Sequence, residues 1–129
     1  MDDRLIDRTT AVLAKVLDGA STRQRVLADN IANVGTPNYT RKEVRFEAQL
    51  REAISQAPQN PTIDVEAIGR VALEISDDKR TPADAHGNNV DIEREMVDMA
   101  KNSLQYETAT RLLSMEFREL RSAIREGRR

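Results

Sequence analysis

Residues 91–126 read DIEREMVDMAKNSLQYETATRLLSMEFRELRSAIRE, and their apolar side chains recur in alternating steps of four and three residues. This spacing is typical of a single apolar stripe along an α-helix. Acidic residues crowd the first turns and arginines the last, which suits the helix macrodipole at both ends. We therefore predict a C-terminal helix over residues 90–127, of which the patterned part, residues 91–126, is roughly 54 Å long at 1.5 Å per residue.

A second stripe with the same spacing runs from Ile6 to Val34, weakened only by Gly19. Gly35 suits a left-handed cap and Pro37 cannot continue a helix, so the pattern predicts an N-terminal helix over residues 1–35. Both helices are longer than the diameter, about 36 Å, of a compact globule of this chain length. The molecule should therefore be elongated.

The two stripes are expected to face each other in coiled-coil-like packing, so that the terminal helices form one discontinuous axial domain. The predicted intramolecular seam consists of Leu13, Leu17, Leu27, Ile31, Met96, Met99, Tyr106, Leu113, Phe117 and Leu120. Aromatic residues make up only 3% of the chain, which a seam of Leu, Ile, Val, Met and Ala tolerates.

Residues 36–89 read as a small irregular connection between the helices. Phe46, Leu50 and Ile54 repeat at helical spacing, which predicts a short helix, and a loop is expected over Gln56–Thr62. One short strand is expected where Val71, Leu73 and Ile75 alternate with polar residues, and Val44 and Phe46 allow a second strand. Residues 76–89 are polar and read as a flexible linker. The predicted fold class is therefore mainly α.

Each terminal helix also carries apolar residues outside the seam. These candidate subunit contacts are Val12, Val16, Val26, Val97, Leu104, Leu112 and Met115. A two-helix hairpin would leave them in water, which favours oligomerisation. The alternative is that the middle segment folds back and covers them.

The composition excludes several classes of function. The chain has no Cys and a single His, His86, and its Ser and Thr residues have no plausible His partner. We therefore predict no enzyme, no metal and no cofactor. The formal net charge of −2 provides no field for nucleic acid. No stretch is long and apolar enough for a membrane span or a cleaved secretory signal.

Two segments resemble the signatures of a known family. Residues 27–39, LADNIANVGTPNY, resemble the N-terminal signature of bacterial flagellar axial proteins, and residues 88–100, NNVDIEREMVDMA, resemble their C-terminal signature. The short chain, the sequence Arg41–Phe46 and the tail Leu112–Leu120 resemble the proximal-rod branch of the flagellar basal-body rod family. Asn38 stands where the family usually has Gly, and because Asn tolerates the left-handed region the turn should survive.

Within the first signature, the turn motif comprises Gly35, Thr36, Pro37, Asn38 and Tyr39. Tyr39 is expected to anchor this turn on the helices. Asn30 and Asn33 lie near the helix end, where their amides either cap freed carbonyls or contact a neighbouring subunit. Both alternatives remain open at this stage.

The resemblance implies a structural subunit of the proximal rod, which assembles through its terminal helices, transmits torque and lines the export channel. It implies export by the flagellar type III apparatus without signal cleavage, and a periplasmic position in the basal body. The implied partners are copies of the chain, other proximal-rod proteins, the membrane ring and the adaptor between ring and rod. The alternative is a soluble helical adaptor or chaperone-like binding module.

Overall fold

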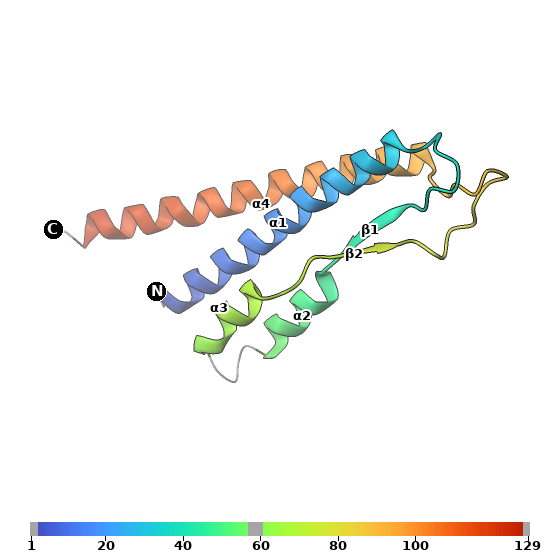
Figure 1. Cartoon of the computed structure of the whole chain (residues 1–129). Helices are drawn as coiled ribbons and strands as arrows, with labels where there is room; N and C mark the ends of the chain where they lie inside the picture. Colours follow the sequence, from blue (N-terminus) through green and yellow to red (C-terminus); the bar gives the residue numbers. More distant parts are fainter. Residues whose placement is uncertain (1–2, 57–60, 128–129) are drawn as a thin grey trace.

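A computed structural model describes residues 3–56 and 61–127 of the chain. The elements in chain order are α1 (Asp3–Ala32), β1 (Lys42–Arg45), α2 (Glu47–Gln56), α3 (Pro61–Gly69), β2 (Glu74–Asp77) and α4 (Ile92–Glu126). Two long helices flank a smaller middle segment (Figure 1). The predicted mainly α fold with long terminal helices is confirmed.

The long helices α1 and α4 run antiparallel and pack against each other, and α4 extends past the start of α1 at the end of the molecule where the chain begins and ends (Figure 1). Asp91 caps the start of α4, where its side chain accepts hydrogen bonds from the backbone N–H groups of Glu93 at 3.0 Å and Arg94 at 3.3 Å. Together with the acidic first turn, this cap explains why α4 begins at Ile92.

The end of α1 differs from the predicted glycine cap. Among the described residues, only Asn38 (φ 58°) and Gly87 (φ 77°) have positive φ, so Gly35 is not the left-handed residue. The chain instead closes successive turns, in which Thr36 N donates to Asn33 O at 3.0 Å and Tyr39 N to Thr36 O at 3.3 Å. Asn38 does occupy the left-handed conformation that the sequence predicted it would tolerate.

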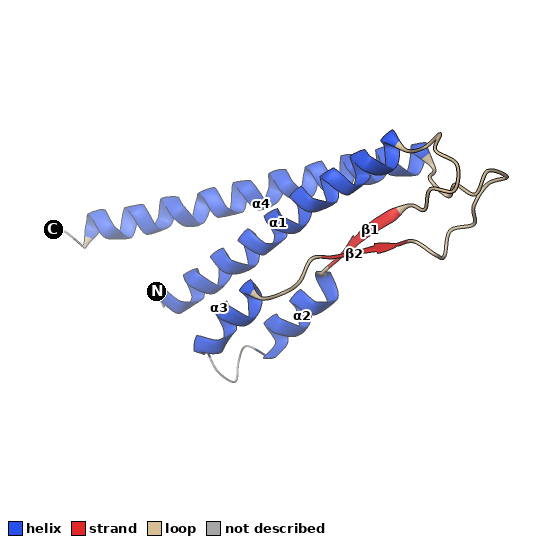
Figure 2. Cartoon of the chain, viewed as in Figure 1, coloured by secondary structure: helices blue, strands red, loops and turns tan. Residues whose placement is uncertain are grey.

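The two strands form an antiparallel ribbon in which Val44 pairs with Ile75. The ribbon lies beside α1 (Figure 2). Strand β2 begins at Glu74, so Val71 and Leu73 precede it and pack against the core instead. Helix α3 is not predicted by the sequence; Pro61 opens it at a position where the missing N–H costs nothing. The predicted loop Gln56–Thr62 lies partly outside the described residues.

The core lies between α1 and the middle segment. Val26, Val44, Phe46, Leu50 and Ile68 form its buried cluster. The Phe46 ring packs directly on the backbone of α1 at Gly19, where an added Cβ would lie 2.2 Å from a ring carbon. The short helices are further tied to α1, because Lys15 Nζ donates to Gly69 O at 2.9 Å. The middle segment therefore covers one side of α1.

Helix α4 receives no such cover over much of its outer surface. Nine of its large apolar side chains are exposed: Ile92, Met96, Val97, Leu104, Tyr106, Leu112, Met115, Phe117 and Ile124. Within residues 3–56 and 61–127, no helix combines the length and the apolar character needed to cross a bilayer.

Candidate functional site

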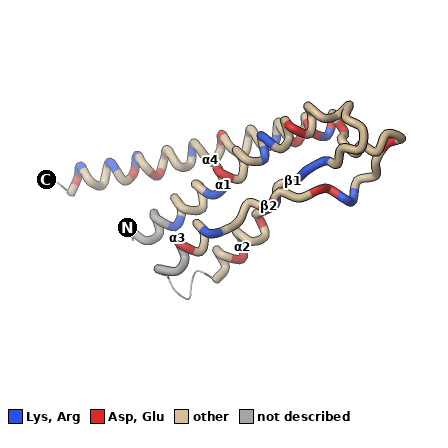
Figure 3. The backbone as a smooth tube through the Cα atoms, in the orientation of Figure 1, with Lys and Arg blue, Asp and Glu red and all other residues tan. Residues whose placement is uncertain are grey.

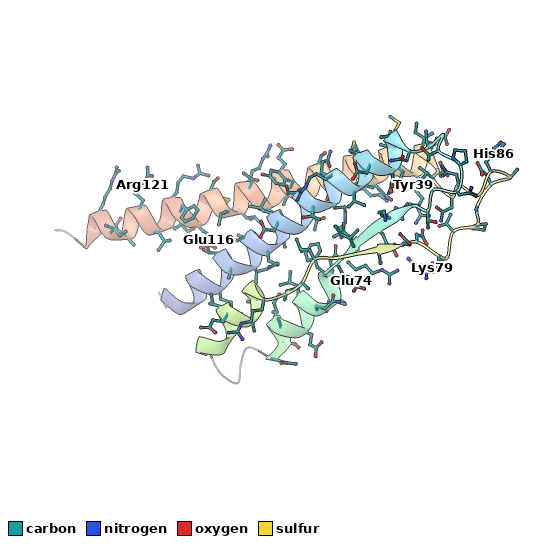
Figure 4. The ribbon with its side chains drawn as sticks, viewed as in Figure 1. Tyr39, Glu74, Lys79, His86, Glu116 and Arg121 are labelled. Atoms are coloured by element: carbon teal, nitrogen blue, oxygen red, sulfur yellow. The ribbon has the colours of Figure 1, made fainter. Side chains whose placement is uncertain are left out.

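The two signature segments, 27–39 and 88–100, meet at the end of the molecule where α1 ends and α4 begins. Tyr39 and His86 mark this end in Figure 4. One backbone hydrogen bond already joins the two regions, since Asn38 N donates to His86 O at 2.9 Å. We call this region the junction, and it comprises Asn30, the turn 33–39, Arg41, the loop 78–91 and the first two turns of α4.

Asn30 is the fully buried amide of the junction. Its Nδ2 donates to Lys42 O at 2.8 Å and Glu95 Oε2 at 2.9 Å, and its Oδ1 accepts from Lys42 N at 3.0 Å and Tyr39 Oη at 3.1 Å. The carboxamide thus pairs with the backbone of Lys42 as a neighbouring strand would. All four hydrogen-bonding positions of this side chain are satisfied inside the chain. The contact with a neighbouring subunit that the sequence allows for Asn30 stays a prediction.

Arg41 is the central charge of the junction and is 5% exposed. Its guanidinium hydrogen-bonds Glu95, and also Asp78 and Asp98, each at 3.3 Å. Glu43 lies 3.8 Å away. Because Glu95 is fully buried, loss of Arg41 would leave an uncompensated carboxylate, at a cost of about 3–5 kcal/mol.

The pKa values of the cluster follow from this geometry. Burial alone would lower the pKa of Arg41, but its hydrogen bond to Glu95 and the nearby carboxylates outweigh burial and raise it. The pKa of Asp78 falls from 3.8 to about 2, chiefly because Thr81 donates a hydrogen bond to it, and despite its burial. Backbone N–H groups of Arg80 and Thr81 add to this effect. Both groups therefore stay charged near neutral pH.

Asn88 and Asn89 bind the second signature to the first. Asn88 Nδ2 lies within 3.1 Å of three backbone oxygens at the end of α1, those of Asn33, Val34 and Thr36. Asn89 Oδ1 accepts a hydrogen bond from Arg41 N at 2.6 Å. The segment 76–89, which the sequence suggested was a flexible linker, is thus attached by buried amides to the turn after α1 and to Arg41.

The remaining residues of the first signature also act within the chain. Asn33 Nδ2 donates to Asp29 O at 2.8 Å and caps a freed carbonyl, which is the first of the two roles considered for it. Thr36 Oγ1 donates to Asn33 Oδ1 at 3.1 Å. Tyr39 anchors the turn to α1 through Asn30, and its pKa is raised, mainly by burial. Gly35 and Pro37 are exposed in the same turn.

The contact between α1 and α4 is more polar than predicted. Glu95, Asn102 and Ala109 are the buried residues of α4, spaced at intervals of seven. Asn102 Nδ2 donates to Ala20 O at 2.8 Å and to Gln24 Oε1 at 2.9 Å. Small side chains at Ala20 and Ala109 allow the two backbones to approach closely.

The predicted seam residues divide into two groups in the structure. Those that lie buried or half-buried are Leu13, Leu17, Leu27, Ile31, Met99, Leu113 and Leu120. Met96, Tyr106 and Phe117 differ from the prediction, because they are 61%, 46% and 53% exposed. The packed face of α4 runs through Glu95, Asn102 and Ala109, so it is rotated by one position from the predicted stripe. Polar residues at these positions hid it from a search for apolar spacing.

The predicted subunit contacts also divide into two groups. On α1, Val26 is buried in the core cluster, and Val12 and Val16 pack against it. The alternative that the middle segment folds back therefore describes α1, and these three valines are not free surface. On α4, Val97, Leu104, Leu112 and Met115 are at least 45% exposed. We call these four residues the outer stripe.

The sequence reasoning missed Arg41, Asp78 and Glu95 because it searched polar residues only for catalysis and metal binding. Arg41 stands next to the turn and Glu95 within the second signature. The charge of these two residues is the signal in the sequence that could have indicated them. Among the described residues, no group of three or more His, Asp or Glu side chains is arranged to hold a metal ion. Acidic and basic residues are interspersed along both long helices (Figure 3). The junction thus holds the two terminal segments together through hydrogen bonds and ion pairs.

Comparison with known proteins is consistent with this structural role. No family model matches the chain. A Bacillus subtilis protein is 30% identical to it, in an alignment that covers 96% of this chain and 98% of the relative. A Borrelia hermsii protein is 35% identical, covering 86% and 91%, and an Escherichia coli K12 protein is 28% identical, covering 95% and 99%. Each of the three is named flagellar basal body rod protein FlgB. With such relatives matched over nearly their whole length, the chain belongs to the FlgB family of flagellar basal body rod proteins.

Proposed function

We propose that this chain is a structural subunit of the proximal rod and assembles through its terminal helices with copies of itself and with other rod proteins. The observation that carries the proposal is the outer stripe of α4. Its four side chains lie on a helix that the middle segment leaves bare, while the equivalent side of α1 is covered. A subunit that assembles with others needs an exposed apolar surface of this kind.

The energetics favour a partner on this surface. Fully burying a Val, Leu or Met side chain is favourable by about 1.5–3 kcal/mol. The four side chains of the outer stripe are each about half exposed. Burying them against a partner would therefore be favourable by several kcal/mol, and exposed apolar surface of this kind is typical of an interface.

The junction supports a mechanical role for the same subunit. It ties the end of α1 to the start of α4 through Asn30, Arg41 and Asn88, so the two long helices move as one unit at that end. Force applied to one helix would pass to the other through buried hydrogen bonds. We propose on this basis that the subunit transmits torque within the rod, and that its long helices line the export channel.

The family membership supports further proposals about location and neighbours. The subunit would lie in the periplasmic part of the basal body, exported by the flagellar type III apparatus without a cleaved signal. Its neighbours would be other proximal-rod proteins, the membrane ring and the adaptor that joins the ring to the rod.

Deletion of the gene in its own bacterium tests the proposal. We expect loss of motility, and basal bodies that carry a membrane ring but no rod, both restored by the wild-type gene on a plasmid. Electron microscopy of isolated basal bodies provides the measurement. Normal rods in the deletion strain would rule the proposal out.

A further inference from the structure

Two separate apolar surfaces lie on opposite sides of the contact between α1 and α4. The first is a groove of about 420 Å³ between the two helices. Its apolar lining comes from Leu13 and Val16 of α1 and from Leu104, Ala109 and Leu112 of α4. Ala109 is buried, whereas Leu104 and Leu112 are 66% and 45% exposed. We call this hollow the apolar groove.

The second surface consists of Tyr106, Phe117 and Ile124, which are 46%, 53% and 64% exposed. We call these three residues the ridge. Successive residues of a helix are turned by about 100°, so Tyr106 lies on nearly the opposite side of α4 from Leu104. Tyr106 lines a different hollow, with Ala20, Gln24 and Asn102. The ridge of one molecule therefore cannot reach its own apolar groove.

The amount of exposed apolar surface on α4 matches that of a protein interface. Its nine large apolar side chains are each between 43% and 66% exposed. This corresponds to something on the order of 800 Å², which is about what each partner contributes to a stable complex. Five of these nine side chains belong to the two surfaces, because Leu104 and Leu112 line the groove and Tyr106, Phe117 and Ile124 form the ridge. The proposed contact therefore draws on about half of this area, divided between two sides of one helix.

We propose that the ridge of one copy packs into the apolar groove of the next copy. This inference rests on the proposed function and specifies how two copies meet. The contact is heterologous, because it joins two different surfaces, and each copy keeps one free ridge and one free groove. Such contacts generate open helical polymers rather than closed dimers unless the rotation happens to close a ring.

Shape and chemistry support this pairing over a symmetric one. The groove is a hollow with an apolar floor at Ala109, and Phe117 offers a bulky aromatic anchor of the kind that fills such hollows in interfaces. In a two-fold pairing of groove against groove, two hollows would face each other and both ridges would stay in water. Pairing ridge with groove covers both surfaces of every interior copy.

Mixing two variants of the full chain provides the test. Phe117→Asp damages the ridge, and Leu104→Asp with Leu112→Asp damages the groove. All three positions are exposed, so each variant should fold, as circular dichroism and thermal unfolding can check. We expect each variant alone to self-associate at least tenfold more weakly than the wild type in sedimentation velocity. An equimolar mixture should recover a one-to-one pair, because one intact ridge meets one intact groove, and should form nothing larger.

Several results would overturn the inference. One is a mixture that stays monomeric, and another is a ridge variant that still forms dimers or polymers alone, which would indicate groove-to-groove pairing. A wild-type chain that stays monomeric at millimolar concentration would exclude this contact between copies and leave the surfaces to other rod proteins. The proposed role as a rod subunit would survive each of these results through contacts with other rod proteins, because the gene deletion tests that role separately.

Discussion

Gly19 lies where the Phe46 ring meets the backbone of α1. An added Cβ would sit 2.2 and 2.3 Å from two ring carbons, well inside van der Waals contact. The ring cannot move away easily, because it is 1% exposed in the core and the Arg23 guanidinium stacks on it, 5.3 Å from its centroid. From the sequence alone, Gly19 is a residue that weakens the helix. In the structure, its missing side chain leaves the space in which Phe46, the largest core side chain, packs on α1.

We expect Gly19→Ala to lower the free energy of unfolding by about 1–3 kcal/mol, as overpacking does. This would reverse the gain of about 1 kcal/mol that Ala normally brings to a helix. Urea denaturation measures the effect. Gly69→Ala is the matched control, since an added Cβ there meets nothing within 4 Å. Equal effects at the two positions would contradict the assigned packing.

The Asp78 carboxylate makes the free energy of unfolding depend on pH in the acid range. Its pKa is about 2 in the folded chain against an ordinary 3.8, so the folded state favours the charged form. The stabilisation, about 2 kcal/mol, is complete above the ordinary pKa and is lost as the pH falls from about 4 towards 2. Between pH 5 and pH 2, we expect the free energy of unfolding of the wild type to fall by about 2 kcal/mol more than that of Asp78→Asn. Urea denaturation at each pH provides the measurement. Thr81→Val should give an intermediate loss, and parallel curves for all three proteins would contradict this assignment.

At the scale of elements, the end of α1 depends on a residue 50 positions or more away in sequence. Asn88 Nδ2 donates to the carbonyls of Asn33, Val34 and Thr36, which lie in the turn that follows α1, and so fixes the path of the chain as it leaves the helix. The helices themselves could be predicted from spacing, because apolar periodicity and the acidic and basic ends are local signals. The contacts of the junction could not be predicted in this way, because they join polar residues that only the folded chain brings together.

We expect Asn88→Ala to lower the free energy of unfolding by about 1–3 kcal/mol, because it removes the buried donor to the carbonyls of Val34 and Thr36 in the turn after α1. Hydrogen exchange should locate the effect at the turn 33–39. His86→Ala lies in the same loop, and its exposed side chain makes it the control, with a change within about 0.5 kcal/mol. A loss of stability shared equally by both variants would show that the loop as a whole, and not the Asn88 amide, holds the turn after α1.

The face of α4 that packs against α1 could be predicted only in part from the spacing of apolar residues. Leu113 and Leu120 are half-buried, as the stripe predicted, but Met96 and Phe117 are exposed. Glu95 and Asn102 occupy the packed face instead, because their hydrogen bonds to Asn30, Ala20 and Gln24 pay for burial. A pattern that counts only apolar residues places such a helix one position out of phase.

At the scale of the molecule, the two long helices determine an extended shape. Helix α4 alone has 35 residues and is about 52 Å long. A compact chain of this length would have a radius of gyration of about 14 Å. We expect small-angle X-ray scattering of the monomer to give a clearly larger value, and a result near 14 Å would mean that the helices do not extend as described.

The central claim is that the outer face of α4 is the surface through which the subunit joins the rod. It is tested most directly by expressing Leu104→Asp/Leu112→Asp from a plasmid in the deletion strain, with Leu104→Met/Leu112→Met as the apolar control. With both proteins present at wild-type levels, we predict that the Met variant restores rods and swimming. The Asp variant should leave membrane rings without rods and cells that do not swim. Normal rods built from the Asp variant would contradict the account.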